Sequence, residues 1–400
     1  MSVVTAFLLL CALAVAGYAA GRQRALSAAN GDTRLMHSLA GFHGSSIALA
    51  MMLAGIAAWL IWTLGLSALP GLDAPTIGSA IILGAGLVAG LVAYRPIGRD
   101  YRARNVVETM IKGLLILAAS IAILTTLGIV LSMLFETIRF FGQYSWNNFF
   151  FGTNWSPNFR GNSDLGMLPL LWGTLYISLI ALIVAVPVGL LIAIYLSEYA
   201  GSRLRSVIKP LIEVLAGIPT IVYGLFALIT VGPLLRDYFA QPLGIGNSTN
   251  SVMTAGLVMG IMLIPFVSSL SDDVINAVPQ AMRDGSLGLG ATKSETIRQV
   301  TIPAALPGIV GAILLAASRA IGETMIVVLG AGAAARMSLN PFEAMTTVTV
   351  KIVSQLTGDT DFAAPETLVA FALGITLFVL TLGLNVLALY IVRKYREQYE

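Results

Sequence analysis

The chain has 400 residues, of which only 23 are Lys or Arg and 20 are Asp or Glu, whereas 57% are hydrophobic. A soluble fold needs about 25% charged residues to cover its surface, so this composition predicts an integral membrane protein and excludes a disordered chain. The net charge of +3 then reflects the membrane, and no nucleic-acid partner is expected. One cysteine and two histidines are too few for an internal disulfide or a histidine-based metal centre.

Apolar runs of about 20 residues, the length that crosses a hydrocarbon core of roughly 30 Å, occur nine times. The sequence therefore predicts an all-α protein with nine spans: Ser2–Ala20, Ser45–Leu69, Pro75–Tyr94, Ile111–Phe135, Leu168–Ser197, Val207–Leu235, Val252–Leu270, Ala305–Ala331 and Thr367–Val392. No basic residue precedes the first run, whereas Arg22 and Arg24 follow it. A signal peptide has the opposite polarity, so we expect a retained span with its N-terminus outside.

Positive charges orient these spans, because Lys and Arg collect in cytoplasmic loops. Alternate loops hold 17 of them, grouped around Arg22, Arg99, Arg203, Arg283 and Arg393. The other loops hold only 5, namely Arg139, Arg160, Arg236, Arg336 and Lys351. We therefore expect the C-terminus inside and a multi-pass protein of the bacterial cytoplasmic (inner) membrane.

A basic stretch at 95–112 divides the chain into two predicted domains. Residues 1–110 form a three-helix membrane extension with plain apolar spans, and residues 111–400 form a six-span domain with a cytoplasmic loop at 271–303. His37 and His43 are expected in a solvated loop of the extension. In the six-span domain, prolines are expected to interrupt several helices, which is tolerated where freed backbone groups face protein or a cavity. These prolines are Pro187, Pro219, Pro233 and Pro265.

Two segments outside the membrane are distinctive. Gln143–Met167 is rich in aromatic and Asn residues, which is typical either of an interfacial belt or of a folded docking surface for an outside partner. Asn340–Leu356 is predicted to form a short helix that Asn340 caps, with Pro341 at its first position. This helix could lie in the interface or re-enter the pathway.

Arg319 and Glu323 are the charged pair expected inside a membrane span, mid-way along Ala305–Ala331. Residues four apart share one helix face and can pair. The pair predicts either a salt bridge that locks two helices or a contact for an anionic solute, for which the planar fork of Arg is suited. Glu213 is expected to be structural and to pair with Lys209.

The cytoplasmic loop carries a motif. Helical segments around Pro279–Leu289 and Thr292–Thr301 are expected to break near Gly290. The loop resembles the docking loop of binding-protein-dependent ABC permeases, Glu-Ala-Ala-x3-Gly-x9-Ile-x-Leu-Pro, although the Glu-Ala-Ala triplet itself is absent. The matching positions, which the resemblance makes an ATPase-coupling loop, are Asp284, Gly285, Ser286, Gly290, Val300, Ile302 and Pro303.

Three further stretches, Trp172–Ser178, Leu211–Phe226 and Ser318–Met325, make the chain from about Phe149 onward similar to the phosphate ABC transporter permease family of PstC type. The resemblance implies a six-span, type I importer-like permease core and a substrate pathway that includes Arg319 and Glu323. It also implies a second, PstA-like permease, two PstB-like ATPase subunits and a periplasmic phosphate-binding protein. The three N-terminal spans are not part of the minimal domain and resemble an extension seen in longer members.

The expected function is therefore ATP-driven import of inorganic phosphate, with no catalytic residue, cofactor or metal in this chain. The sequence has no Gly-x4-Gly-Lys-[Ser/Thr] loop, so ATP and Mg are expected on the partner ATPase. Three alternatives stay open: a permease for another oxyanion such as molybdate or sulfate, an ATP-independent secondary transporter or channel, and a signalling or scaffold role. Glu323 favours phosphate over a fully ionised anion, and Asp284–Pro303 favours an ATPase-driven permease.

Overall fold

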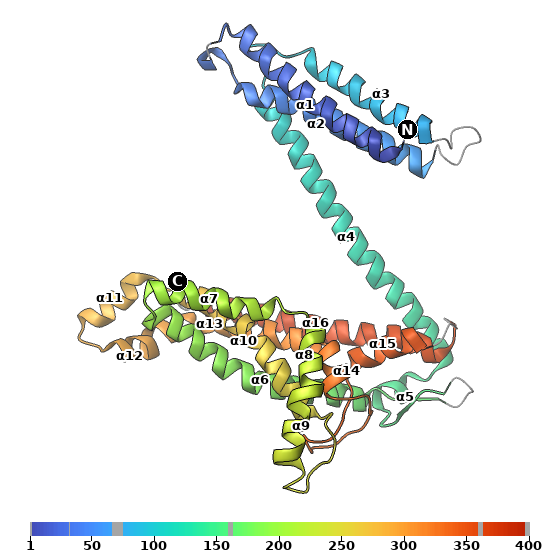
Figure 1. Ribbon diagram of the computed structural model, residues 1–400, viewed down its shortest axis with the longest axis vertical. Coiled ribbons are helices and arrows are strands. Elements are labelled where there is room, and N and C mark those ends of the chain that lie inside the picture. Colours follow the sequence, from blue (N-terminus) through green and yellow to red (C-terminus); the bar gives the residue numbers. More distant parts are fainter. Residues whose placement is uncertain (1, 32, 66–74, 159–162, 359–362, 397–400) are drawn as a thin grey trace. The chain divides into compact units, whose positions relative to one another are not determined.

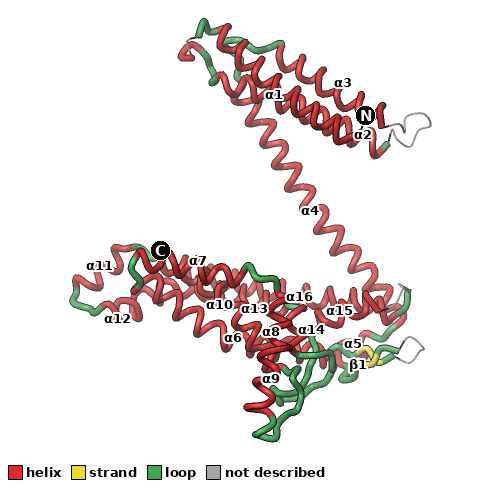
Figure 2. The backbone as a smooth tube through the Cα atoms, viewed as in Figure 1, coloured by secondary structure: helices red, strands yellow, loops and turns green. Residues whose placement is uncertain are grey.

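The computed structural model describes residues 2–31, 33–65, 75–158, 163–358 and 363–396 (Figure 1). Arg160 and the last residues of the second predicted span lie outside these ranges. Figure 2 shows that helices make up most of the described chain. Contacts divide it into two compact units, Met1–Leu127 and Gly128–Glu400. The long helix α4 (Ala103–Gln143) belongs to both, and each unit is described by itself.

The first unit is a bundle of three apolar helices, α1 (Val3–Ala28), α2 (Ala40–Leu64) and α3 (Pro75–Tyr94), with a 3-10 turn at Thr33–Leu35. Each helix packs on the other two (Figure 1). Small residues let them approach closely. A Cβ on Gly55, for example, would lie 2.3 Å from Leu10 Cδ2.

The expectation of a solvated loop is wrong for His43. This residue lies in α2 and is fully buried, with its ring centroid 5.7 Å from that of Tyr101. α2 begins at Ala40, five residues before the predicted span, and so takes His43 into the bundle.

The second unit contains the remaining helices and one pair of short strands. Their bounds are α5 (Trp146–Phe151), β1 (Trp155–Ser156), β2 (Asp164–Leu165), α6 (Leu168–Ile194), α7 (Ser202–Ala216), α8 (Thr220–Phe226), α9 (Gly232–Leu235), α10 (Val252–Ala277), α11 (Gln280–Gly288), α12 (Lys293–Thr296), α13 (Ile302–Ile321), α14 (Met325–Gly330), α15 (Val348–Gly358) and α16 (Pro365–Arg396). π-helical turns link several of them, at Tyr195–Tyr199, Ala227–Val231, Arg236–Ala240 and Ile297–Thr301.

The core of this unit is the packed pair α6 and α10. α13 lies against α10 and α16, α7 lies against α10, and α14 lies against α8 (Figure 1). Gly256 and Gly260 of α10 face Ile180 and Val184 of α6, so a Cβ on either glycine would lie under 3.0 Å from the α6 side chain. The close approach of α6 and α10 forms the packing core against which other helices of this unit lie.

Within the described residues, nine helical segments are long and apolar enough to cross a membrane, and each overlaps one predicted span. Two of the predicted spans continue through a break between helices. The sixth span was placed at Val207–Leu235 but occurs at Thr220–Ala240, because α7 ends at Ala216 and Pro219 starts a new helix. The eighth ends at Ile321 instead of Ala331.

The prolines behave differently from one another. Pro187 lies inside α6 and Pro265 inside α10, and both helices continue through them. Pro233 is close to the start of α9, within the continuous helical run from Thr220 to Ala240. Only Pro219 follows residues that separate two helices, so the expected interruption is confirmed at that position alone among the four.

The aromatic outer segment is folded. Phe149 of α5 is fully buried, and its ring lies 5.4 Å from that of Phe140 and 4.9 Å from that of Phe150. Trp155 of β1 pairs with Leu165 of β2 in an antiparallel register. These aromatic side chains form a local core.

The helix predicted from Asn340 begins eight residues later, at Val348. Asn340 instead caps a turn, since its side-chain oxygen accepts the Phe342 N–H at 3.0 Å. The α15 helix that follows packs on α16 and α6.

Candidate functional site

Arg319 lies in the last turn of α13, and its side chain is exposed. α13 starts at Ile302 with Pro303 in its first turn, where a missing N–H costs nothing, and the small residues Ala316–Ser318 directly precede Arg319. Among the ion pairs of the described residues, none includes Arg319. No described carboxylate therefore lies within ion-pair distance of the guanidinium.

Glu323 follows the α13 C-cap residue Gly322 and is buried, with 9% of its surface exposed. One carboxylate oxygen accepts the N–H of Met325, the first residue of α14, at 3.1 Å. Its main-chain carbonyl accepts the Thr349 hydroxyl at 2.8 Å. A negative charge at a helix start is favourable, because the first N–H groups of a helix have no partner within it.

The predicted pairing of Arg319 with Glu323 is wrong. That prediction assumed one helix over Ala305–Ala331, but α13 ends at Ile321 and α14 begins at Met325. The two residues therefore do not share a helix face. Glu323 turns into the protein against α15, whereas Arg319 stays exposed at the end of α13 rather than mid-way along a helix.

Buried hydroxyl groups surround Glu323, and sequence reasoning missed them. Thr349 donates to the Glu323 carbonyl, so the 2.9 Å contact between the Thr347 and Thr349 hydroxyls has Thr347 as the donor. Thr174 of α6 accepts the Val348 N–H at 3.0 Å. The run Thr346-Thr347-Val348-Thr349, in an otherwise apolar region, was the signal that could have identified this group.

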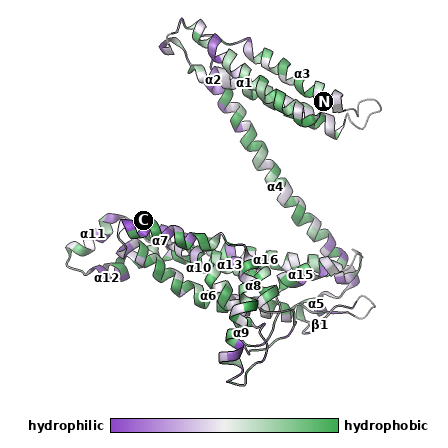
Figure 3. Ribbon diagram, in the orientation of Figure 1, coloured by the Kyte–Doolittle hydropathy of each residue, from purple (hydrophilic) through white to green (hydrophobic). Residues whose placement is uncertain are grey.

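The loop at 271–303 has the predicted helical form, with α11 and α12 separated near Gly290. Gly290 has φ +90°, a conformation that favours glycine. The Ser286 hydroxyl lies 3.0 Å from that of Thr296, which ties α11 to α12. Asp284 is exposed and accepts a hydrogen bond from Gln280 at 3.1 Å. Figure 3 shows hydrophilic residues on this part of the chain.

The remaining motif positions lie where the loop returns to the membrane helices. Gly285 is exposed in α11, and Val300 belongs to the π-helical turn Ile297–Thr301. Ile302 and Pro303 open α13, so that turn joins the loop directly to the helix that carries Arg319. The structure thus connects the two predicted sites through one continuous helical run.

An ion pair anchors the loop to the helix core. Arg283 of α11 lies 3.1 Å from Glu198, which is in the π-helical turn after α6, and both side chains are largely buried. The Arg283 guanidinium also donates to the Ile275 carbonyl of α10 at 2.6 Å. α11 is therefore fastened to both central helices.

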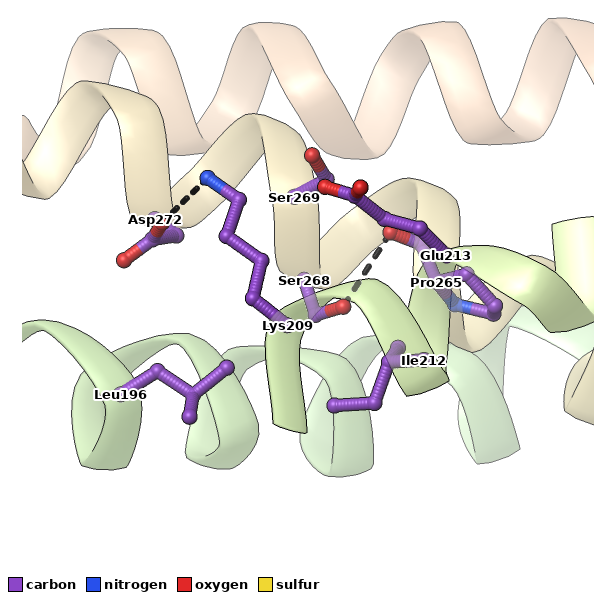
Figure 4. Close-up of a pocket in the computed structure, with 8 residues that line it drawn as sticks. All are labelled: Leu196, Lys209, Ile212, Glu213, Pro265, Ser268, Ser269 and Asp272. Atoms are coloured by element: carbon purple, nitrogen blue, oxygen red, sulfur yellow. Dashed lines mark hydrogen bonds and ion pairs between the residues drawn. The ribbon is translucent and has the colours of Figure 1, made fainter. Parts of the chain in front are cut away.

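A second charge network joins α7 to α10. Asp272 of α10 is fully buried and accepts from Arg205 at 2.8 Å, from Lys209 at 2.8 Å and from Asn276 at 2.9 Å. The hydrogen bond to Asp272 raises the pKa of the Lys209 ammonium. Figure 4 shows Lys209 reaching Asp272 beside a small cavity that Glu213 also lines. Lys209 thus pairs with Asp272 and Asp273 rather than with Glu213.

No group of three or more His, Cys, Asp or Glu side chains that could hold a metal ion occurs in the described part of the chain. The chemistry of the site is that of charged and hydroxyl side chains at helix ends.

Known proteins resemble both units. The family described as "Binding-protein-dependent transport system inner membrane component" matches residues 185–397, and the family described as "Phosphate ATP-binding cassette transporter" matches residues 7–70. The "Phosphate transport system permease protein PstC" of Mesorhizobium japonicum is 33% identical, over 69% of this chain and 88% of that protein. The protein of the same name from Haemophilus influenzae is 31% identical, over 75% of this chain and 97% of that protein.

Among solved structures, a chain of a bacterial alginate ABC transporter in complex with its alginate pentasaccharide-bound periplasmic protein shares the fold. It has a TM-score of 0.50 and 16% identity, over 72% of this chain and 97% of that chain. Together with the nine apolar helices, this likeness defines a multi-pass membrane protein with the permease fold of ABC importers. The chain belongs to the family of binding-protein-dependent transport system inner membrane components.

Proposed function

We propose that this chain is the permease subunit of an ATP-driven importer of inorganic phosphate and forms the translocation path with a second, PstA-like permease. Its relatives that are named phosphate transport permeases support phosphate as the transported solute. The observation that carries the proposal is the exposed guanidinium of Arg319 at the end of a membrane helix, without a described carboxylate partner. A planar fork of donors binds a tetrahedral oxyanion through two parallel hydrogen bonds.

Glu323 gives the site its selectivity in this proposal. One of its carboxylate oxygens holds the Met325 N–H, and the carboxylate can accept a further donor. Monoprotonated phosphate carries an O–H that a carboxylate can accept, whereas sulfate at neutral pH carries none. Glu323 therefore repels a fully ionised anion more than it repels phosphate.

The partners in this proposal are two PstB-like ATPase subunits, which bind ATP and Mg, and a periplasmic phosphate-binding protein. The loop α11–α12 docks on the ATPase in the cytoplasm. Its apolar side chains support this role, since Leu289 is 92% exposed and Leu287 is 46% exposed. Large exposed apolar side chains on an otherwise polar loop are typical of a protein-binding surface. The protein lies in the cytoplasmic (inner) membrane with its C-terminus inside.

The test is uptake by the reconstituted transporter. The chain is assembled with its second permease, ATPase and binding-protein partners in vesicles, and ATP-dependent uptake of labelled phosphate is measured against labelled sulfate. Arg319→Gln should reduce phosphate uptake at least tenfold while leaving assembly unchanged. Arg336→Gln, which removes another exposed Arg from an outer loop, is the matched control and should retain uptake.

Each alternative has its own outcome. If sulfate or molybdate is taken up as well as phosphate, the transporter accepts oxyanions in general and is not specific for phosphate. Uptake that follows an ion gradient and ignores ATP would identify a secondary transporter. Normal phosphate uptake by Arg319→Gln would remove Arg319 from the pathway. Glu323→Gln keeps the acceptor for the Met325 N–H and loses only the charge, so it should raise sulfate uptake relative to phosphate uptake.

A further inference from the structure

The first unit has an apolar groove that packing of the bundle leaves open. It has a volume of about 330 Å³, which is at the lower end of the usual range of roughly 300–1,000 Å³ for ligand pockets. α1 and α3 form its two walls, and α2 forms its floor through Ile47 and Met51. The wall residues are Ala16, Gly17, Ala20, Leu87, Gly90 and Leu91.

One end of this groove is cationic. Tyr94, the last residue of α3, lines the groove, and the Arg24 guanidinium lies 4.3 Å from the centroid of its ring. Arg24 also donates to the Arg95 carbonyl at 3.3 Å, and the other N–H donors of the guanidinium have no hydrogen-bond acceptor among the described residues. Arg22 and Arg95 are exposed at the same end of the bundle.

These cations are not neutralised by the described carboxylates. The described part of this unit contains only two acidic residues, Asp100 and Glu108, and the ion pair that includes Glu108 is made with Arg104. An apolar groove that ends at basic side chains is complementary to an amphiphile with a hydrocarbon chain and an anionic head. Basic pockets between membrane helices bind anionic lipid head groups in this way.

We propose that this groove is a binding site for an anionic glycerophospholipid. One acyl chain lies between α1 and α3 over Met51 of α2, whose side chain packs against Gly17 and Gly90. The phosphate of the head group accepts hydrogen bonds from Arg24, while Tyr94 holds the guanidinium in place. This site is separate from Arg319 and Glu323 and does not depend on the transported solute.

A packed transmembrane helix is the competing occupant. A helix would fill the apolar walls but would bring the Arg24 end of the groove into contact with an apolar surface, at the cost of burying a charge. An anionic phospholipid covers the apolar walls with its acyl chain and pairs the Arg24 end of the groove with its phosphate. The lipid is therefore favoured by the charge at the end of the groove.

The experiment is native mass spectrometry of the full chain, purified in detergent and supplied with phosphatidylglycerol or phosphatidylcholine of the same acyl chains. The wild-type chain should retain one phosphatidylglycerol with at least fivefold preference over phosphatidylcholine. Arg24→Gln and, separately, Arg95→Gln test the head-group contact. Lys112→Gln removes a positive charge from α4, away from the groove lining, and is the control.

The acyl-chain contact has its own matched pair on α1. Ala16 is exposed and lines the groove, whereas the neighbouring Val15 is 69% exposed and does not line it. Ala16→Trp should lower retention of both lipids at least fivefold, and Val15→Trp should leave it unchanged. Circular dichroism and size-exclusion chromatography verify that each variant is folded.

Two results would overturn the proposal. Equal retention of the two lipids by the wild-type chain would exclude recognition of an anionic head group, without recourse to any variant. Alternatively, a photo-crosslinker at Ala20 in the assembled transporter that reacts with a partner subunit rather than with lipid would assign the groove to a protein helix. Loss of preference in Arg24→Gln together with unchanged preference in Lys112→Gln would support the lipid site.

Discussion

At the scale of single residues, the protein tolerates charge in an apolar fold by surrounding it with several partners. Asp272 is fully buried and has Arg205, Lys209 and Asn276 as donors. The two cations are different, since their side chains keep 32% and 28% of their surface exposed. A buried charge without a partner is costly, whereas a partly exposed one is hydrated. The buried carboxylate therefore controls the energetics of the network.

This asymmetry gives a prediction for stability. Replacing both cations, Arg205→Met with Lys209→Met, leaves Asp272 buried and unpaired and should cost about 3–5 kcal/mol. Asp272→Asn leaves only cations that water can reach and should cost about 1 kcal/mol. Unfolding in detergent by heat or denaturant measures both.

Combining all three substitutions tests the cause. Adding Asp272→Asn to the double variant removes the unpaired charge, so it should recover most of the lost stability. Arg203→Met, an exposed position of the same helix, serves as the control. A triple variant less stable than the double variant would contradict this explanation.

At the scale of helices, the functional features occur at joints. The joint before α8 contains Pro219, the joint between α13 and α14 contains Gly322, and the joint between α11 and α12 contains Gly290. Each joint contains a glycine or a proline. Glycine adopts backbone conformations that other residues avoid, and proline cannot continue a helix. Glu323 owes its burial to the second of these joints.

The joint between α11 and α12 gives a matched pair of variants. A Cβ would meet open space at both Gly288 and Gly290, but only Gly290 has φ +90°. Gly290→Ala should therefore strain the joint by about 1–2 kcal/mol, reduce phosphate uptake and weaken its coupling to ATP hydrolysis. Gly288→Ala should leave both unchanged. Coupled uptake and ATPase measurements on the assembled transporter decide this, and normal coupling in Gly290→Ala would exclude the strained joint as part of the mechanism.

A close approach between α6 and the segment before α15 gives another prediction. A Cβ on Gly173 would lie 2.1 Å from the Thr346 carbonyl oxygen, which is main chain and cannot rotate away. Gly173→Ala should displace Thr346–Thr349, and with it the contact to Glu323, so phosphate uptake should fall at least fivefold. Gly128→Ala in α4, where a Cβ meets nothing within 4 Å, is the control. Full uptake by Gly173→Ala would show that the segment can shift without affecting the path.

At the scale of the whole molecule, the distribution of positive charge predicts the orientation in the membrane. The loop α11–α12 belongs to the class with 17 positive charges, and the aromatic segment Gln143–Met167 belongs to the class with 5. We therefore expect the two on opposite sides of the membrane.

Cysteine labelling tests this orientation. In a Cys11→Ala background, Leu289→Cys and Trp146→Cys place thiols at side chains that are 92% and 63% exposed. A membrane-impermeant maleimide added outside intact cells should label Trp146→Cys, and Leu289→Cys should react only after the cells are opened. The reverse pattern would invert the topology.

Much of the fold was predictable from the sequence, because the length of an apolar run reports the thickness of the membrane directly. All nine predicted runs overlap helices of the described chain that are long and apolar enough to span a membrane. The helix ends were less predictable. The joint Gly217–Pro219 is apolar, so hydropathy did not reveal the break within Val207–Leu235. The joint after Ile321 contains Glu323 and Thr324, but the apolar runs on both sides of it led to the prediction of one continuous helix over Ala305–Ala331.

The candidate site was predictable as a list of residues but not as an arrangement. A charged residue in an apolar segment is conspicuous, which identified Arg319 and Glu323. Their separation depends on where α13 ends, and the contact with Thr349 depends on how α15 packs. Neither follows from spacing along the chain.

The sequence by itself determined the class of this protein, its nine spans and its docking-loop motif, because hydropathy and local turn chemistry act over short stretches. Only the tertiary structure decided which charges meet. It brought Lys209 to Asp272 instead of Glu213, buried Glu323 against α15, and left an apolar groove beside Arg24. The reason is physical: a buried charge takes the partner that neighbouring helices bring within hydrogen-bond distance, whatever its position in the chain.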